Sequence, residues 1–169
     1  MAQPLVEQLR FTRAEWTRAL RGVSERDGAR RLEPMNSVGW IVGHLAWQEQ
    51  LYWLTRALDR TPLPVLNEVV ASGGPATTPS LQEMRAAWKR ITGEADPWLD
   101  SLTAAELLGE LRRPSGSKRS VGDAMQRMIY HYWFHIGEIL AIRQLLGHQR
   151  LPEYVGPLEA RATYRQPAD

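Results

Sequence analysis

Three of the four histidines stand where helix geometry could bring their side chains to a single point. His131 and His135 are four residues apart, so on a helix they point in nearly the same direction, one turn apart. His44 belongs to a separate run in which apolar residues recur at steps of four and three. Three imidazoles with an open fourth position are typical of catalytic zinc sites, and nickel, iron and manganese accept the same ligands. One interpretation of the spacing is therefore a divalent-metal site.

The same spacing also fits three core histidines that are hydrogen-bonded inside a helical protein. A single inward-facing histidine is more often such a core residue than a metal ligand, and pairs four residues apart also occur by chance. Burying three imidazoles without partners is costly, however, because each ring carries polar nitrogens. Spacing alone leaves both interpretations open.

Glu138 follows His135 by three residues and could serve the same site in three ways. It could orient an imidazole by accepting its N–H, act as a base, or be a fourth ligand. The alternative is an ion pair near the helix end with a basic residue such as Arg143. His148 follows beyond the end of the predicted helix, and we interpret it as structural.

The chain has no cysteine, which excludes several kinds of chemistry. Disulfides, thiolate zinc sites, iron–sulfur clusters and a cysteine nucleophile are all ruled out. The sequence also lacks five common motifs: Glu-x-x-His, His-Glu-x-x-His, Gly-x-Ser-x-Gly, the P-loop and Gly-x-Gly-x-x-Gly. Without them, a di-iron site, a serine hydrolase and a nucleotide-binding fold lose their usual support. The net charge is only +2, and the densest basic stretch, residues 112–119, is interpreted as a solvated loop. Nucleic-acid binding is therefore not expected.

Four amphipathic helices are predicted to position these residues, because apolar side chains recur at alternating steps of four and three. The helices are expected at about residues 3–24, 37–58, 81–102 and 121–146. Helix-capping residues are expected at Asn36 or Ser37, Ser80, Thr103 and Ser120. This pattern predicts an all-α fold, a four-helix bundle that forms a single domain over residues 1–169.

Two further segments have no helical period. Residues 59–79 form a long connection, which either lets the second and third helices run parallel or covers a site as a flap. Residues 148–169 are expected to pack across the bundle as an extended tail. The N-terminal residues have no apolar core like that of a signal peptide, and no stretch is long enough to span a membrane, so a cytoplasmic protein is expected.

Aromatic residues are expected in the core and at one surface. Five of the seven tryptophans fall on the predicted apolar stripes: Trp16, Trp40, Trp47, Trp88 and Trp98. Trp133 and Phe134, with Leu140 nearby, are predicted on the other side of the last helix from His135. Because an extra apolar helix face indicates a partner surface, we expect a homodimer.

Two segments resemble the DinB/YfiT-like superfamily, and the resemblance extends over nearly the whole chain. They are residues 36–47, NSVGWIVGHLAW, and residues 131–138, HYWFHIGE. The resemblance implies that His44, His131 and His135 bind a divalent metal. The family often has Arg-Gly-Gln after the last ligand, whereas this chain has Ile-Gly-Glu at residues 136–138.

The resemblance also implies a reaction. Relatives in the superfamily include S-transferases and a maleylpyruvate isomerase that use a low-molecular-weight thiol such as mycothiol or bacillithiol. For this chain it implies a metal that binds and deprotonates a small thiol, which then attacks an electrophilic small molecule, while Glu138 handles protons. One alternative is metal-assisted hydrolysis with water in the fourth position. Another is a non-enzymatic, stress-related binding protein, which predicts no open cavity beside the histidines.

Overall fold

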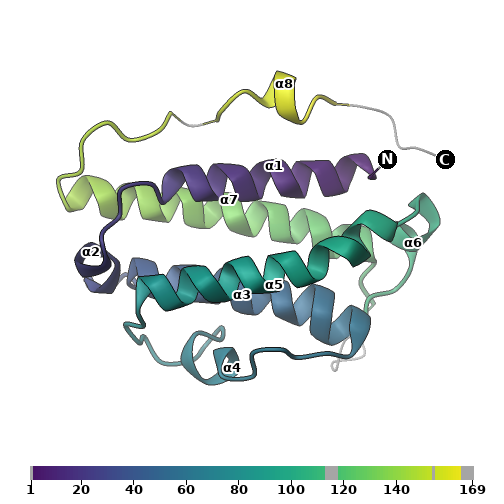
Figure 1. Ribbon diagram of the computed structural model, residues 1–169, viewed down its shortest axis with the longest axis horizontal. Helices are drawn as coiled ribbons and strands as arrows, with labels where there is room; N and C mark the ends of the chain where they lie inside the picture. Colours follow the sequence, from purple (N-terminus) through teal and green to yellow (C-terminus); the bar gives the residue numbers. More distant parts are fainter. Residues whose placement is uncertain (1, 113–117, 154, 165–169) are drawn as a thin grey trace.

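The computed structural model describes residues 2–112, 118–153 and 155–164, and four long helices dominate it (Figure 1). The helices are α1 (Pro4–Ala19), α2 (Glu25–Ala29), α3 (Val38–Glu49), η1 (Gln50–Arg56), α4 (Leu66–Val69), α5 (Leu81–Ser101), α6 (Ala104–Leu108), α7 (Val121–Leu145) and α8 (Leu158–Arg161). No β-strand occurs in the described ranges, where the only sheet-like pairing is an isolated bridge. The expected all-α fold is therefore confirmed.

The long helices form two pairs, α1 with α7 and α3 with α5 (Figure 1). The two helices of each pair run parallel, and the two pairs run in opposite directions. The starts of α3 and α5 lie together, since a Cβ on Gly39 would lie 2.4 Å from the carbonyl oxygen of Pro79. The ends of α1 and α7 are likewise joined, because Arg143 donates to the carbonyl oxygen of Ala19. The connection before α5 is therefore a crossover, one of the two roles predicted from its length.

Each helix with a predicted capping residue starts directly after that residue. The side-chain oxygens of Ser37, Ser80, Thr103 and Ser120 each accept a backbone N–H three residues later, starting α3, α5, α6 and α7. Such bonds satisfy amide groups that have no partner within the first helical turn. The starts of the helices that carry the site are thus encoded locally.

The first helix is shorter than predicted. It ends at Ala19 rather than near residue 24, and a turn follows in which Gly22 has a φ of 77°. This left-handed conformation suits glycine because it has no Cβ. Ser24 then caps the short helix α2, which the sequence did not predict.

The second long helix changes its winding halfway. After Glu49 it continues as the π-helix η1, which rotates the following side chains relative to an α-helix. Trp53 is fully buried as a result, whereas Leu51 and Leu58, predicted on the core stripe, are only partly buried. The regular spacing of apolar residues contained no signal for this change.

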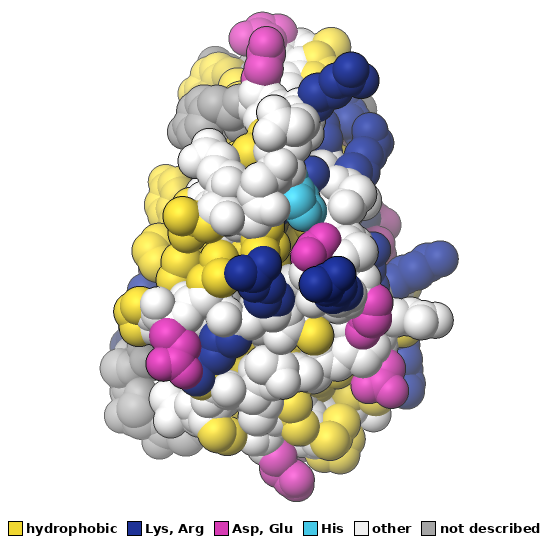
Figure 2. All heavy atoms as spheres, turned by 90° about the vertical axis from the view of Figure 1, so that its left-hand side faces the viewer, with side chains coloured by type: hydrophobic (Ala, Val, Ile, Leu, Met, Phe, Trp, Pro, Cys, Tyr) yellow, Lys and Arg dark blue, Asp and Glu magenta, His cyan; other side chains and the backbone are white. Residues whose placement is uncertain are grey.

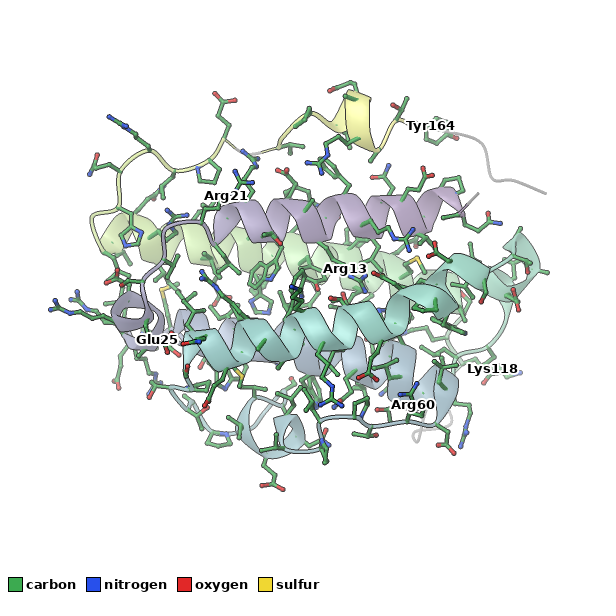
Figure 3. The ribbon with its side chains drawn as sticks, in the orientation of Figure 1. Arg13, Arg21, Glu25, Arg60, Lys118 and Tyr164 are labelled. Atoms are coloured by element: carbon green, nitrogen blue, oxygen red, sulfur yellow. The ribbon has the colours of Figure 1, made fainter. Side chains whose placement is uncertain are left out.

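A buried polar network joins the four long helices. Arg13, which points from α1 into the space between the helices (Figure 3), donates to both carboxylate oxygens of Glu49, at 2.8 and 2.6 Å. The same guanidinium donates to Asp96 on α5. Tyr132 on α7 donates to Glu49 at 2.7 Å and accepts from the Trp88 indole at 2.6 Å. The sequence pattern placed Tyr132 and Trp88 facing inward, but it did not predict Arg13, Glu49 and Asp96 in the core.

The C-terminal tail lies along α1 (Figure 1). Gln8 donates to the carbonyl oxygen of Ala162, and Glu15 accepts the N–H of Gly156. The tail is not wholly extended, because it contains the helical turn α8. Residues 154 and 165–169 of the predicted tail lie outside the described residues.

The surface of α7 differs in part from the prediction. Phe134 is 66% exposed, as expected, but Trp133 and Leu140 are partly buried and pack against the core. Leu145, at the end of α7, is 69% exposed.

Charged side chains of both signs share the end of the bundle at which α2 lies, so this face carries no continuous basic patch (Figure 2). Most of the basic loop, residues 113–117, lies outside the described residues. None of the described helices is long and apolar enough to cross a membrane.

Candidate metal centre

The bundle brings together the three histidines that the sequence predicted as ligands. His44 comes from α3, and His131 and His135 come from the antiparallel helix α7. One ring nitrogen of each lies within 4.8 Å of the others, and the Nε2 atoms of His131 and His135 are 2.9 Å apart. Two distant segments of sequence thus converge on one point.

Two of the imidazoles are held by acceptors on their outer nitrogen. His44 Nδ1 lies 2.9 Å from the carbonyl oxygen of Val70, and His135 Nδ1 lies 2.6 Å from Glu138 Oε2. These acceptors place the proton on Nδ1, which leaves the lone pair on Nε2. Orientation of a ligand histidine by a carbonyl or carboxylate is a common feature of metal sites.

Two tryptophans enclose the His44 ring. Trp40 stacks on it with a centroid distance of 4.7 Å, and Trp47 stacks at 5.4 Å. Each indole N–H is fixed by the crossover segment, Trp40 donating to Pro75 and Trp47 to Asn67. The crossover therefore positions His44 through its neighbours as well as through Val70.

Burial keeps His44 and His131 uncharged. Burial lowers the pKa of His44 to about 4, against the effect of its bond to Val70. Burial, followed by the neighbouring His135 and His44, lowers the pKa of His131 to about 3. Near neutral pH both rings have free lone pairs, as metal ligands require. The donor set therefore fits a divalent metal such as zinc, nickel, iron or manganese.

A cleft of about 430 Å³ opens beside the histidines. It is lined by His44, Gln48, Ser72, Asp123, Gln126, Arg127, Tyr130 and His131. Arg127 lies one helical turn before His131 and has no hydrogen-bond or ion-pair partner among the described residues. The cleft thus combines two imidazoles with a guanidinium that is free to bind an anion.

The remaining two candidate residues are placed differently. Glu138 contacts His135 rather than Arg143, which instead bonds to the carbonyl oxygen of Ala19. His148 lies outside the triad, where its ring accepts from Arg143 and lies 3.3 Å from Asp27. It thus links the end of α7 to α2, in agreement with the structural interpretation.

Sequence reasoning missed the residues that support the triad. Trp40 and Trp47 were assigned only to the core, although they lie four residues before and three residues after His44, which places them on its helix face. Arg127 has the same four-residue relation to His131. Val70 contributes a backbone carbonyl, which no side-chain pattern reveals.

Comparison with known proteins supports the resemblance seen in the sequence. No curated protein matches the chain. A family model described as the DinB superfamily matches residues 8–139, which include the three histidines and most of the bundle. The chain belongs to the DinB superfamily.

Proposed function

We propose that this protein is a divalent-metal-dependent enzyme that transfers a low-molecular-weight thiol to an electrophilic small molecule. The observation that supports it most is the cleft of about 430 Å³ that opens on His44 and His131. A purely structural metal site has all its coordination positions closed by protein. An imidazole cluster facing a cavity is the arrangement that a reacting substrate needs.

Each residue of the site has a separate task in this proposal. His44, His131 and His135 would hold the metal, which would supply a charge that lowers the pKa of a thiol or water toward neutral pH. Glu138 is a positioning residue, since it holds the ring of His135 through Nδ1. Arg127 binds an anionic group of the thiol or of its acceptor.

The transfer balances without a redox partner. The thiol loses its proton to a base, and its sulfur forms a bond to an electrophilic carbon. In a substitution the leaving group departs with the bonding electrons, and in an addition the neighbouring carbon takes up a proton. Because the chain has no cysteine, the sulfur must come from a small molecule.

The main alternative is metal-assisted hydrolysis, which uses the same three ligands and the same cleft. It differs in needing no thiol, so substrates separate the two reactions. The non-enzymatic interpretation predicted no cavity beside the histidines, and the cleft argues against it.

The test combines metal, thiol and electrophile. Protein loaded separately with zinc, nickel, iron or manganese is mixed with 1-chloro-2,4-dinitrobenzene and with cysteine, glutathione, mycothiol or bacillithiol. We expect one metal–thiol pair to accelerate thioether formation above the spontaneous rate. A parallel assay with a p-nitrophenyl ester and no thiol tests hydrolysis.

Two histidine variants control the experiment. His135→Ala should lose both stoichiometric metal, measured by elemental analysis, and the metal-dependent rate. His148→Ala removes the histidine outside the triad and should keep both. Equal rates in wild-type protein, chelator-treated protein and His135→Ala with every thiol would contradict the proposal.

A further inference from the structure

A second pocket of about 310 Å³ lies between α1 and α5 and shares no lining residue with the metal cleft. We call it the α1–α5 pocket. Its lining residues come from the end of α1, the turn after it, one residue of α3 and the first half of α5. Its volume is at the lower end of the range of about 300–1,000 Å³ for small-molecule sites.

The walls of the α1–α5 pocket are mainly apolar. Trp16, Leu20 and Val42 are buried, and Trp88 is partly buried. The indole of Trp88 is held by its bond to Tyr132, so this wall is fixed. The Nε1 of Trp16 is buried and has no hydrogen-bond partner among the described residues.

The mouth of the pocket is cationic. Arg21, Arg85 and Lys89 line it. Arg85 is tied to the carbonyl oxygen of Leu20 at 2.8 Å, whereas Arg21 and Lys89 are exposed and have no partner in the described part of the chain. Figure 3 places Arg21 beside the end of α1. No acidic residue of the described ranges lines the pocket.

We propose that the α1–α5 pocket binds a small amphipathic organic anion, an aryl or medium-chain carboxylate. The apolar body of the ligand contacts Trp16, Trp88 and Val42, which removes apolar surface of both partners from water. The carboxylate stays at the mouth, where Arg21 and Lys89 donate charge-assisted hydrogen bonds to it. The pocket should bind amines of the same shape more weakly, because the positive charge of the amine would lie beside the guanidinium and ammonium groups at the mouth.

The site is independent of the proposed reaction. A carboxylate that bound at the metal would contact His44 or His131, and neither residue lines this pocket. Binding in the α1–α5 pocket is therefore expected to persist when the metal is removed.

Calorimetric titration of the full-length, metal-loaded protein tests this site with three probes of equal chain length. These are octanoate, 1-octanol and octylammonium. We expect octanoate to bind and octylammonium to bind at least about tenfold more weakly. Chelator-treated wild-type protein should bind octanoate as well as metal-loaded protein does.

Variants locate the binding. Lys89→Gln and Arg21→Gln, at exposed positions, should each weaken octanoate binding by up to about tenfold and leave octanol binding unchanged. Thr17→Trp, at the exposed edge of the pocket, should fill the pocket and abolish binding of both. Arg30→Gln removes the same charge from an exposed residue outside the lining and should change nothing.

The results that overturn the proposal are equally specific. They are an absence of octanoate binding, equal binding of octylammonium, loss of binding on chelation, or octanoate affinity unchanged in both Lys89→Gln and Arg21→Gln.

Discussion

His44 and His135 are oriented by different hydrogen-bond acceptors. A neutral backbone carbonyl orients the ring of His44, and a carboxylate orients the ring of His135. A carboxylate raises the basicity of its imidazole as well as orienting it. Glu138→Ala should therefore weaken metal binding by about 10–100-fold. Glu138→Gln, whose amide oxygen still accepts from Nδ1, should lose less. Metal affinity is measured by competition with a chromophoric chelator.

An exposed residue on the same helix provides the control for this prediction. Gln144→Ala should bind metal as the wild type does, because Gln144 is exposed beyond the site. Wild-type affinity in Glu138→Ala would show that Glu138 does not support His135.

Because Tyr132 is buried, we expect the free energy of unfolding to fall at alkaline pH. Burial, and then the charge of Glu49, raise the pKa of Tyr132 well above its usual value near 10. In the unfolded chain the phenol ionises from about pH 10, whereas the folded chain keeps its proton. The contribution of Tyr132 is therefore complete below pH 10 and falls by up to about 1.4 kcal/mol per pH unit above it.

Urea unfolding from pH 8 to 11 measures this effect. The stability difference between wild type and Tyr132→Phe should shrink above pH 10, since phenylalanine has no proton to lose. Tyr130→Phe, at a residue 68% exposed, should follow the wild-type pH profile. A constant difference between wild type and Tyr132→Phe up to pH 11 would refute the prediction.

The candidate metal ligands were visible in the sequence because histidine is rare in this chain and the spacing of His131 and His135 fits one helix face. The rest of the site was not visible, for physical reasons. Val70 acts through its backbone, which every residue type has. The buried network, which is separate from the site, was not visible either, because Arg13 and Glu49 are charged and such residues are seldom buried unless they are paired. Their pairing spans two helices, so no local pattern predicts it.

At the scale of the elements, close contact between α3 and α5 depends on two glycines one turn apart. A Cβ on Gly39 would meet the backbone oxygen of Pro79 at 2.4 Å, and one on Gly43 would meet Met84 Sδ at 2.5 Å. Gly39→Ala should destabilise the protein by about 1–3 kcal/mol, because backbone must move. Gly93→Ala, in the middle of α5, should stabilise it by about 0.5–1 kcal/mol, because a Cβ there would have no described atom within 4 Å beyond its own helix backbone and chain neighbours.

Urea unfolding of the two variants compares these effects under the same conditions. If Gly39→Ala were as stable as Gly93→Ala, the close approach of the two helices at this point would be incorrect.

The helix starts were predictable because capping is local, whereas the winding of η1 was not. Ser37 and Ser120 cap through residues three positions away. The apolar residues from Trp47 to Leu58 keep an α-helical spacing although the chain changes to a π-helix at Gln50. No single side chain in η1 indicates the change to a π-helix. Tertiary packing, which buries Trp53 between the helices, overrides the local period.

At the scale of the whole molecule, the outer face of α7 bears on association. Tyr130, Phe134 and Leu145 are 68%, 66% and 69% exposed along this helix. We expect a homodimer formed through this face, because exposed apolar side chains along one helix favour an interface. Sedimentation equilibrium should show a dimer that dissociates in Phe134→Glu and persists in Leu108→Glu, a change at an 83% exposed residue of α6. A monomeric wild type at tens of micromolar would refute this expectation.

In the buried network, the ion pair between Arg13 and Glu49 is expected to hold the two helix pairs together. Burial alone would lower the pKa of Arg13, but the charge of Glu49 and its hydrogen bonds raise that pKa above the usual value, so the guanidinium stays charged. Replacing Glu49 leaves the buried guanidinium of Arg13 with only the partly exposed Asp96 as an ionic partner. Glu49→Gln should therefore lower the free energy of unfolding by about 3–5 kcal/mol.

Glu94, whose ion pair with Arg60 is exposed, provides the comparison. Glu94→Gln should cost about 0–1 kcal/mol in the same urea titration. Replacing both Arg13 and Glu49 by methionine should restore much of the stability lost in Glu49→Gln, because no buried charge is then left unpaired. If the double variant were as unstable as the sum of the two single methionine variants, the charges would act independently and the network would not join the helices.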